Sequence, residues 1–315
     1  MPRVVVTRSL PEPALRALHE SGADVWVSSE DRALRAEELH EAVRGADAIV
    51  TMLHDRVDDT LLAAAGEQLR VVANVAVGYD NVDLEAARRR GVTITNTPGV
   101  LTDATDDLAI ALILAITRRL GEGERRIRSG EPWAWSIDFM LGRGLRGKTL
   151  GILGYGAIGR ATAARARAFG MDVVYTRRSP GGDPGRVELG ELLERAHVVS
   201  LHCPLTPETR HLIDADALAR MRRDAYLVNT ARGAIVDEAA LAAALRDGAI
   251  AGAALDVFER EPEVDPGLVG LDNVVLVPHL GSATVETRTA MAELAAANAI
   301  AVLAGEHPPT PVLQT

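Results

Sequence analysis

The chain has 315 residues, of which 47% are hydrophobic, and a formal net charge of −10. That length and composition allow a large buried core and two domains. The acidic balance without any basic block argues against nucleic-acid binding. The longest apolar run, residues 108–116, is too short to span a bilayer, and we expect no membrane association.

The compartment is indicated by cysteine usage and by the N-terminus. The single Cys203 cannot form an intrachain disulfide, which favours a reducing compartment. The first residues pass from a few apolar side chains straight into Pro11, Glu12 and Pro13 and lack the apolar stretch of a signal peptide. We therefore expect a cytoplasmic protein.

Short apolar segments alternate with helical patterns through the first hundred residues. Strands are predicted over residues 4–7, 24–27, 48–51, 71–74 and 93–96. Helices are predicted over residues 13–21, 36–43, 60–65 and 84–90. This alternation predicts a parallel sheet covered by helices.

A longer helix is predicted over residues 102–120, with three aspartates near its start, where carboxylates favour the helix dipole. We expect this helix to link two domains. A polar, Arg-rich stretch then leads to Trp133, Trp135 and Phe139 in a chain that is only 3% aromatic. Such a cluster is more typical of packing at a domain or subunit boundary than of chemistry.

The second half repeats the alternation of strands and helices. Strands are predicted over residues 149–153, 172–176, 198–202, 225–229, 251–256 and 274–277. Helices are predicted over residues 157–169, 189–195, 215–220, 238–247 and 285–303, the last long enough to return to the first domain. The pattern predicts an α/β protein with two Rossmann-like domains.

Gly154, Gly156 and Gly159 form a G-x-G-x-x-G motif between a predicted strand and a predicted helix, the context that this motif requires. The first glycine permits a tight turn, the second lets a pyrophosphate approach the backbone, and the third lets helix and strand pack closely. N–H groups at the helix N-terminus can then bind phosphates. The motif predicts dinucleotide binding, with a structural turn as the alternative.

The residues at the end of the next strand indicate which dinucleotide is bound. An acidic residue there would bind the ribose 2′-OH of NAD, whereas arginine accommodates the 2′-phosphate of NADP. This chain has Thr176, Arg177, Arg178 and Ser179, whose guanidinium and hydroxyl groups can surround a phosphate. NADP(H) is favoured over NAD(H), and a solvated basic loop is the alternative.

Ligands of such sheets bind beyond the carboxyl ends of the strands, where Arg232, Glu261 and His279 are found. Arginine can bind a carboxylate bidentately, histidine can transfer a proton near neutral pH, and a carboxylate beside that histidine would keep it protonated. Together they suit hydride transfer to a 2-oxo acid. Taken singly, each residue has a structural alternative. Arg232 could form a salt bridge, Glu261 could cap a turn, and His279 could be a histidine whose hydrogen bonds are made within the protein.

Seven segments together identify a family. They are VAVGYDNVD (75–83), TDATDDLAIALIL (102–114), GKTLGILGYGAIG (147–159), LHCPLTPETRHLI (201–213), NTARG (229–233), LDVFEREP (255–262) and PHLGSAT (278–284). They resemble the D-isomer-specific 2-hydroxyacid dehydrogenase family, in particular its glyoxylate/hydroxypyruvate reductase branch. The resemblance implies that Arg232 binds and polarises the substrate, that His279 is the acid/base, and that Glu261 is its carboxylate partner.

The resemblance also implies further ligand-binding positions. Val77 and Gly78 would offer backbone N–H groups to the substrate carboxylate, with Leu53 and Asn74 nearby, and no metal is expected. Asp256 would bind the nicotinamide carboxamide. The implied cofactor-binding residues are Gly154, Gly156, Ala157, Ile158, Gly159, Thr176, Arg177, Arg178, Ser179, Cys203, Pro204, Thr209, Thr230, Ala231, Arg232, Asp256, His279, Ser282 and Thr105, with Leu108 beside Thr105. Loop and core packing is the alternative for those positions.

For the fold, the likeness implies a flavodoxin-like substrate-binding domain and a dinucleotide-binding Rossmann domain, both with parallel sheets, and a cleft between them. We expect the substrate-binding (catalytic) domain to comprise residues 1–98 plus 288–315 and the dinucleotide-binding domain residues 99–287. The likeness also implies a homodimer in which a tryptophan reaches the partner's pocket. Trp135 is the candidate, with Trp133 or simple interface packing as alternatives.

Differences from other members of the family narrow the expected function. Phosphite-oxidising relatives carry lysine where this chain has Val77, formate dehydrogenases carry glutamine at Glu261, and phosphoglycerate dehydrogenases usually have an acidic residue at Arg177. We expect reduction of glyoxylate or hydroxypyruvate to the D-2-hydroxy acid by NADPH. The alternatives are a bulkier 2-oxo acid, an NAD(H)-dependent phosphoglycerate-dehydrogenase-like enzyme, and a dinucleotide-responsive corepressor-like binding protein.

Overall fold

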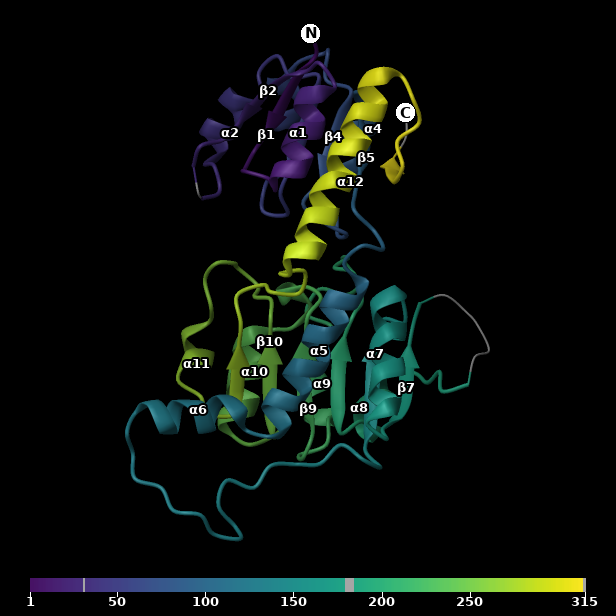
Figure 1. Ribbon diagram of the computed structural model, residues 1–315. Helices are drawn as coiled ribbons and strands as arrows, with labels where there is room; N and C mark the ends of the chain where they lie inside the picture. The colour runs from purple at the N-terminus through teal and green to yellow at the C-terminus, as the bar shows by residue number, and fades with distance from the viewer. Residues whose placement is uncertain (31, 179–183, 314–315) are drawn as a thin grey trace. The chain divides into compact units, whose positions relative to one another are not determined.

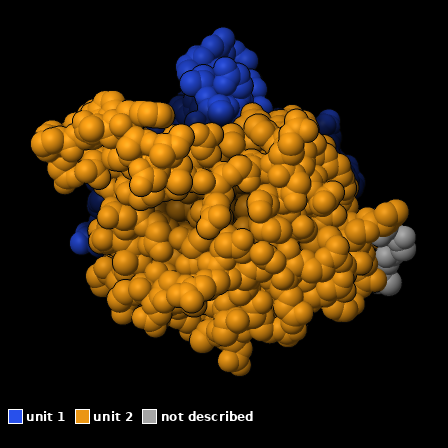
Figure 2. Space-filling model, turned by 90° about the horizontal axis from the view of Figure 1, so that it is seen from below, with its two compact units in different colours: residues 1–101, 283–315 blue, residues 102–282 orange. Residues whose placement is uncertain are grey.

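The structure, a computed structural model, describes residues 1–30, 32–178 and 184–313. The chain divides into two compact units: unit 1, residues 1–101 and 283–315, and unit 2, residues 102–282. Figure 1 shows their helices and strands, and Figure 2 colours unit 1 blue and unit 2 orange. In the described chain, each unit is built on one six-stranded sheet.

The sheet of unit 1 has the strand order β12-β5-β4-β3-β1-β2. Its strands are β1 (Arg3–Val6), β2 (Asp24–Val27), β3 (Ala48–Thr51), β4 (Val71–Asn74), β5 (Thr93–Thr95) and β12 (Pro311–Leu313). Its helices are α1 (Glu12–Glu20), α2 (Ala36–Ala42), α3 (Asp59–Ala65), α4 (Leu84–Arg89) and α12 (Val285–Ala304). The five parallel strands follow the order 2-1-3-4-5, which is flavodoxin-like.

Both faces of this sheet are buried because successive strand side chains point to opposite sides. Val4 and Val6 pack with α1 and α12, whereas Val5 packs with α2, α3 and α4. Strands buried on both faces are apolar throughout rather than at every second residue. This explains why the short strands of the sequence read as continuous apolar runs.

The sheet of unit 2 has the order β11-β10-β9-β8-β6-β7, and all its pairs are parallel. Its strands are β6 (Thr149–Leu153), β7 (Asp172–Thr176), β8 (Val198–Leu201), β9 (Tyr226–Asn229), β10 (Gly252–Leu255) and β11 (Val274–Leu276). Its helices are α5 (Thr102–Thr117), α6 (Leu120–Arg128), α7 (Ala157–Ala168), α8 (Leu189–Arg195), α9 (Ala215–Arg220), α10 (Glu238–Arg246) and α11 (Pro266–Val269), with a 3-10 turn η1 (Gly233–Ile235).

The core of unit 2 also lies on both faces of its sheet. Ile152 packs on the side of α5 and α7, whereas its neighbour Leu153 packs on the side of α8, α9 and α10. The predicted α/β class with two helix-covered parallel sheets is therefore confirmed. In the part of the chain that the structure describes, no helix is both long and apolar enough to cross a membrane.

Four elements differ from the sequence-based predictions, namely α5, α6, α11 and β12. The helix expected over residues 102–120 ends at Thr117 because Arg119 adopts a left-handed conformation, with φ of 55°, and α6 then begins as a separate helix. Neither α11 nor β12 is predicted, since each is very short and begins with a proline. β12 forms by antiparallel pairing with the edge strand β5.

Candidate active site

The predicted site residues of unit 2 gather in the loops that follow its strands. Gly154 follows β6, Thr176 ends β7, Cys203 comes after β8, Arg232 after β9 and His279 after β11. The carboxyl ends of parallel strands lie on one edge of a sheet, where ligands of doubly wound folds bind. One edge of unit 2 thus carries both the glycine motif and the three candidate catalytic residues.

The three motif glycines occupy three different environments. Gly154 has φ of +99°, and a Cβ there would overlap the backbone nitrogen of Cys203. A Cβ on Gly159 would overlap the carbonyl oxygen of Gly154, so both positions need glycine for close packing. A Cβ on Gly156 would meet no described atom within 4 Å. Only the second glycine therefore faces open space.

These surroundings fit a dinucleotide. Gly156 is the N-cap of α7, so the first N–H groups of this helix border the open space, as a pyrophosphate requires. The hydroxyl oxygen of Thr230 is buried and has no hydrogen-bond partner among the described residues. A buried hydroxyl is normally paired, and a polar ligand at this edge would supply the partner.

The residues expected to select the cofactor follow β7. Thr176 and Arg177 are half-buried, Arg178 is exposed, and Ser179 lies outside the described residues. The pKa of Glu208 is lowered, chiefly by a hydrogen bond with Thr206 and in part by the charge of Arg178. This loop after β7 is therefore cationic, with one carboxylate close to its exposed arginine.

His279 and Glu261 form the central pair of the site. Nδ1 of His279 lies 2.9 Å from Oε2 of Glu261, whose Oε1 accepts a hydrogen bond from the Phe258 N–H at 3.0 Å. Burial acts to raise the pKa of Glu261, but the hydrogen bond and charge of His279, the Phe258 N–H and the charge of Arg232 outweigh it, and the pKa is lowered. The two side chains are 27% and 29% exposed, so a small molecule can reach an imidazole backed by an ionised carboxylate.

Arg232 is placed by a close contact between two loops. A Cβ on the next residue, Gly233, would overlap the backbone carbonyl of Phe258, so the loop after β9 rests directly on the loop that carries Glu261. Nδ2 of Asn229 also donates a hydrogen bond to the Arg232 carbonyl at 2.9 Å. The backbone on both sides of Arg232 is thereby fixed.

Asp256 holds the loop of His279. Its carboxylate accepts hydrogen bonds from the N–H of Leu280 and, at 2.9 Å, from that of Gly281, and its carbonyl accepts from the His279 N–H at 2.8 Å. Burial raises its pKa despite these bonds. The bonds support His279 at φ of 52°, a left-handed conformation uncommon outside glycine. Thr105 lies against the same loop, since a Cβ on Gly281 would lie 3.5 Å from the methyl carbon of Thr105.

Other predicted cofactor residues have local roles in the structure. The Thr209 hydroxyl donates a hydrogen bond to the Pro204 carbonyl at 2.7 Å and accepts one from the Thr206 N–H at 2.7 Å, so it is engaged within its own loop. Burial raises the pKa of the Cys203 thiol to about 12, which leaves it protonated and a poor nucleophile. Ala231 and Ser282 are half-buried.

Four predicted substrate-binding residues belong to unit 1. Leu53 follows β3 and is exposed, and Asn74 is the buried last residue of β4. Nδ2 of Asn74 donates a hydrogen bond to the Gly78 carbonyl at 3.0 Å. Among the described residues, nothing accepts a hydrogen bond from the N–H groups of Val77 and Gly78. Successive free backbone N–H groups suit an anion such as a carboxylate.

Trp135 is not part of the strand-end cluster within this chain. It is 76% exposed and lies in the segment between α6 and β6, which Figure 1 shows at the edge where the strands of unit 2 begin. Trp133 stacks on Phe139 with ring centroids 6.2 Å apart. Trp133 therefore packs within its own segment, whereas Trp135 presents its ring to solvent.

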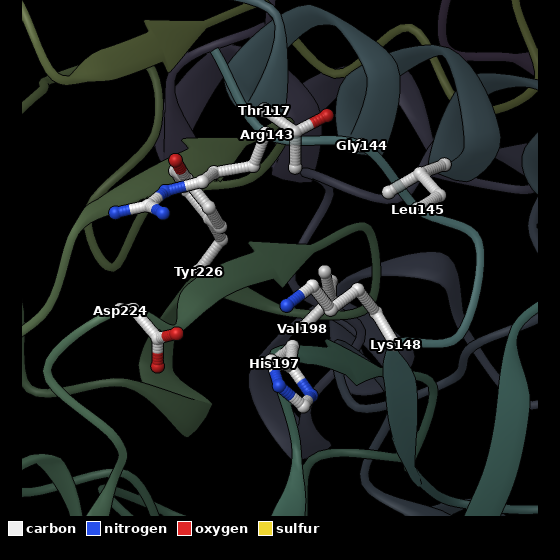
Figure 3. A pocket seen from close by; sticks show the side chains of 9 residues that line it. All are labelled: Thr117, Arg143, Gly144, Leu145, Lys148, His197, Val198, Asp224 and Tyr226. Carbon is white, nitrogen blue, oxygen red and sulfur yellow. The ribbon is translucent and has the colours of Figure 1, made fainter.

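A small pocket also lies at the edge where strands begin (Figure 3). Its volume is about 20 Å³, room for one or two water molecules. It is lined by Thr117, Arg143, Gly144, Leu145, Lys148, His197, Val198, Asp224 and Tyr226. It is too small for a dinucleotide. In residues 1–30, 32–178 and 184–313, no group of three or more His, Cys, Asp and Glu side chains could hold a metal.

Asn229 and Gly233 also position Arg232, and neither is predicted from the sequence as a site residue, although both belong to the NTARG segment. The effect of Gly233 depends on the neighbouring loop at Phe258, which no local pattern reveals, and that of Asn229 depends on its hydrogen bond to the Arg232 carbonyl. The available signal is the glycine directly after Arg232, because glycine at a strand end often marks a close backbone approach.

Comparison with known proteins identifies relatives along the whole chain. Residues 110–281 match the family model described as D-isomer specific 2-hydroxyacid dehydrogenase, NAD binding domain. The glyoxylate reductase of Thermococcus litoralis is 47% identical over 319 residues, covering 98% of this chain and 96% of the relative.

Solved structures show the same likeness. The TT0316 protein from Thermus thermophilus is 49% identical, with a TM-score of 0.94 over 99% of this chain and 100% of that one. An NADPH-dependent glyoxylate/hydroxypyruvate reductase from Sinorhizobium meliloti, solved with NADP and malonate, is 35% identical. Its TM-score is 0.86 over 99% of this chain and 96% of that one.

We expect Gly233→Ala to destabilise the protein by about 3 kcal/mol or more, because the added methyl group would displace the Phe258 backbone. Gly156→Ala is the matched control, since it adds the same group into open space. Urea unfolding monitored by circular dichroism measures both. Equal unfolding midpoints for Gly233→Ala and wild type would contradict the close packing of the two loops.

Proposed function

The chain belongs to the D-isomer specific 2-hydroxyacid dehydrogenase family, and on that basis we propose that it reduces glyoxylate or hydroxypyruvate to the D-2-hydroxy acid with NADPH. The observation that carries the proposal is the His279–Glu261 hydrogen bond, with Arg232 beside it, at the edge that bears the glycine motif. Full-length similarity to a glyoxylate reductase supports the substrate class.

The proposed chemistry assigns each polar group one task. The Arg232 guanidinium binds the oxo acid and polarises its carbonyl, and the N–H groups of Val77 and Gly78 bind its carboxylate. Bound NADPH would supply the hydride that adds to the carbonyl carbon. His279, whose Nδ1 is engaged by Glu261, donates a proton from Nε2 to the carbonyl oxygen as negative charge develops there. Glu261 stays ionised and stabilises the imidazolium before the transfer.

The roles of the two parts of the chain follow from the same assignment. Residues 99–287 would bind the dinucleotide, and residues 1–98 plus 288–315 would bind the substrate. Arg177 and Arg178 support NADP(H) over NAD(H) through the charge that they offer to a 2′-phosphate. The relative solved with NADP supports the same choice. Glu208, which lies close to Arg178, opposes it in part.

We place the protein in the cytoplasm as a homodimer. Trp135, Ile137 and Leu141 lie in one segment and are 76%, 82% and 65% exposed. Large apolar side chains exposed together in one segment are typical of a protein–protein interface. In a dimer this segment would lie against the partner, where Trp135 would border the partner's substrate. The single Cys203 suits a reducing compartment.

The first experiment follows oxidation of NADPH and, separately, of NADH at 340 nm with glyoxylate, hydroxypyruvate, pyruvate and phenylpyruvate. We expect fast turnover of the two small oxo acids with NADPH and a loss of about 10²–10⁴-fold in kcat for His279→Ala. A preference for NADH would overturn the cofactor assignment, and one for phenylpyruvate the substrate assignment. Tight dinucleotide binding without turnover would favour the binding-protein alternative.

The pH dependence tests the role of Glu261. Because its pKa is lowered, Glu261 is ionised near neutral pH and its charge stabilises protonated His279. Glu261→Gln removes that charge, so the pH above which kcat/KM for reduction declines should move down by about one to two units. Glu259→Gln is the control, because Glu259 pairs with His211 rather than with His279. An unchanged profile for Glu261→Gln would remove Glu261 from the mechanism.

Trp135→Ala tests the contribution of the partner subunit. We expect a higher KM for the oxo acid at an unchanged affinity for NADPH, because the indole would border substrate rather than cofactor. Trp133→Ala serves as the comparison, since Trp133 stacks on Phe139 in its own segment. Light scattering reports whether either variant changes the oligomeric state. If the KM of Trp135→Ala equals that of wild type for every accepted oxo acid, the proposed role of Trp135 is refuted.

A further inference from the structure

Two buried asparagines hold the loop after β4 in unit 1 by its carbonyl groups. Nδ2 of Asn96 donates a hydrogen bond to the Val77 carbonyl at 2.8 Å. Nδ2 of Asn74 donates one to the Gly78 carbonyl at 3.0 Å. Both asparagines are buried. Losing a buried hydrogen bond leaves its carbonyl unsatisfied, which costs more free energy than losing a solvent-exposed hydrogen bond. The loop is therefore fixed through its oxygen atoms.

Fixing the carbonyls also fixes the direction of the N–H groups. A peptide group is planar and trans, so the Val77 carbonyl and the Gly78 N–H point in opposite directions. The hydrogen bond from Asn96 thus turns the Gly78 N–H away from Asn96. In the same way, the Ala76 carbonyl accepts a hydrogen bond from the Thr97 N–H at 2.9 Å, which directs the Val77 N–H. These two N–H groups are the ones without a described acceptor.

Asn96 is held in turn by the C-terminal part of the chain. Its carbonyl accepts a hydrogen bond from the Thr310 hydroxyl at 2.6 Å, and its N–H donates to the Thr310 carbonyl at 3.3 Å. Thr310 and Asn298 of α12 form a reciprocal pair. Nδ2 of Asn298 donates to the Thr310 hydroxyl oxygen at 2.8 Å, and the Thr310 N–H donates to Oδ1 of Asn298 at 2.9 Å.

In the hydrogen-bond relay from Asn298 through Thr310 and Asn96 to Val77, each group donates or accepts as its chemistry allows. The Thr310 hydroxyl donates its one hydrogen to Asn96 and accepts from Asn298, as a hydroxyl can. Asn298 is fully buried, and its Nδ2 also donates a longer hydrogen bond, of 3.5 Å, directly to the Asn96 carbonyl. The residue before β12 therefore connects α12 to the loop that follows β4.

From these contacts we infer that Asn96 is a positioning residue for the substrate carboxylate, and that Thr310 and Asn298 hold it in place. The C-terminal segment then sets the affinity for the 2-oxo acid without touching the substrate. This inference rests on the proposed function, which places the carboxylate at the N–H groups of Val77 and Gly78.

Thr310 offers a matched pair of variants. Thr310→Val removes the hydroxyl while nearly keeping the shape, and Thr310→Ser keeps the hydroxyl. In the full-length protein, we expect Thr310→Val to raise the KM for glyoxylate about threefold to tenfold and Thr310→Ser less than about twofold. Asn96→Ala should raise it about tenfold or more. The kcat and the KM for NADPH should stay unchanged, because a lost uniform binding interaction changes only the KM for that ligand.

The outcomes separate the inference from the proposed function. If wild type reduces glyoxylate but Thr310→Val and Thr310→Ser share its KM, the relay is wrong and the proposed function stands. A KM for NADPH that rises in step with that for glyoxylate, together with a lower melting temperature, would show general destabilisation and would also overturn the inference. If wild type reduces no 2-oxo acid, the proposed function fails and the inference fails with it. If Asn96→Ala does not fold, the comparison of Thr310→Val with Thr310→Ser tests the inference by itself.

Discussion

Parallel pairing of the strands in unit 2 is the constraint on which the candidate site depends. It brings the carboxyl ends of β6, β8, β9, β10 and β11 to one edge, so that the glycine motif, Arg232 and His279 lie along the same edge although they are far apart in the sequence. The strands themselves are buried and their backbone groups are paired within the sheet. Polar chemistry is therefore confined to the loops at the strand ends.

Glycines then decide how closely those loops approach one another. At Gly154, Gly159 and Gly233 a Cβ would overlap backbone atoms of a neighbouring segment, whereas at Gly156 it would meet open space. The first three therefore let backbone segments pack more closely than a side chain would allow. The open position at Gly156 lets a ligand approach the backbone. Near the close contact at Gly233, the charge of Arg232 acts on Glu261.

The sequence was sufficient for features with a local pattern and insufficient for those that depend on distant contacts. Buried apolar runs predicted the parallel strands, and strand-end positions with the family likeness predicted the His279–Glu261 pair, which is hydrogen-bonded in the structure. β12 has no such pattern, because its three residues begin with Pro311 and are held by pairing with β5. The Asn96–Thr310 hydrogen bonds join residues more than two hundred positions apart, and neither amide nor hydroxyl has a periodicity that marks it.

The two units differ in the kind of polar group that they carry, and under the proposed function this difference suits a 2-oxo acid. Unit 2 carries groups that change or carry charge, namely Arg232, Glu261 and His279, whereas unit 1 carries backbone N–H groups in a loop whose carbonyls accept hydrogen bonds from neutral asparagine amides. Fixed dipoles bind an anion without titrating near neutral pH. Under the proposed function, binding of the carboxylate through unit 1 is then independent of pH, whereas the proton comes from a side chain of unit 2.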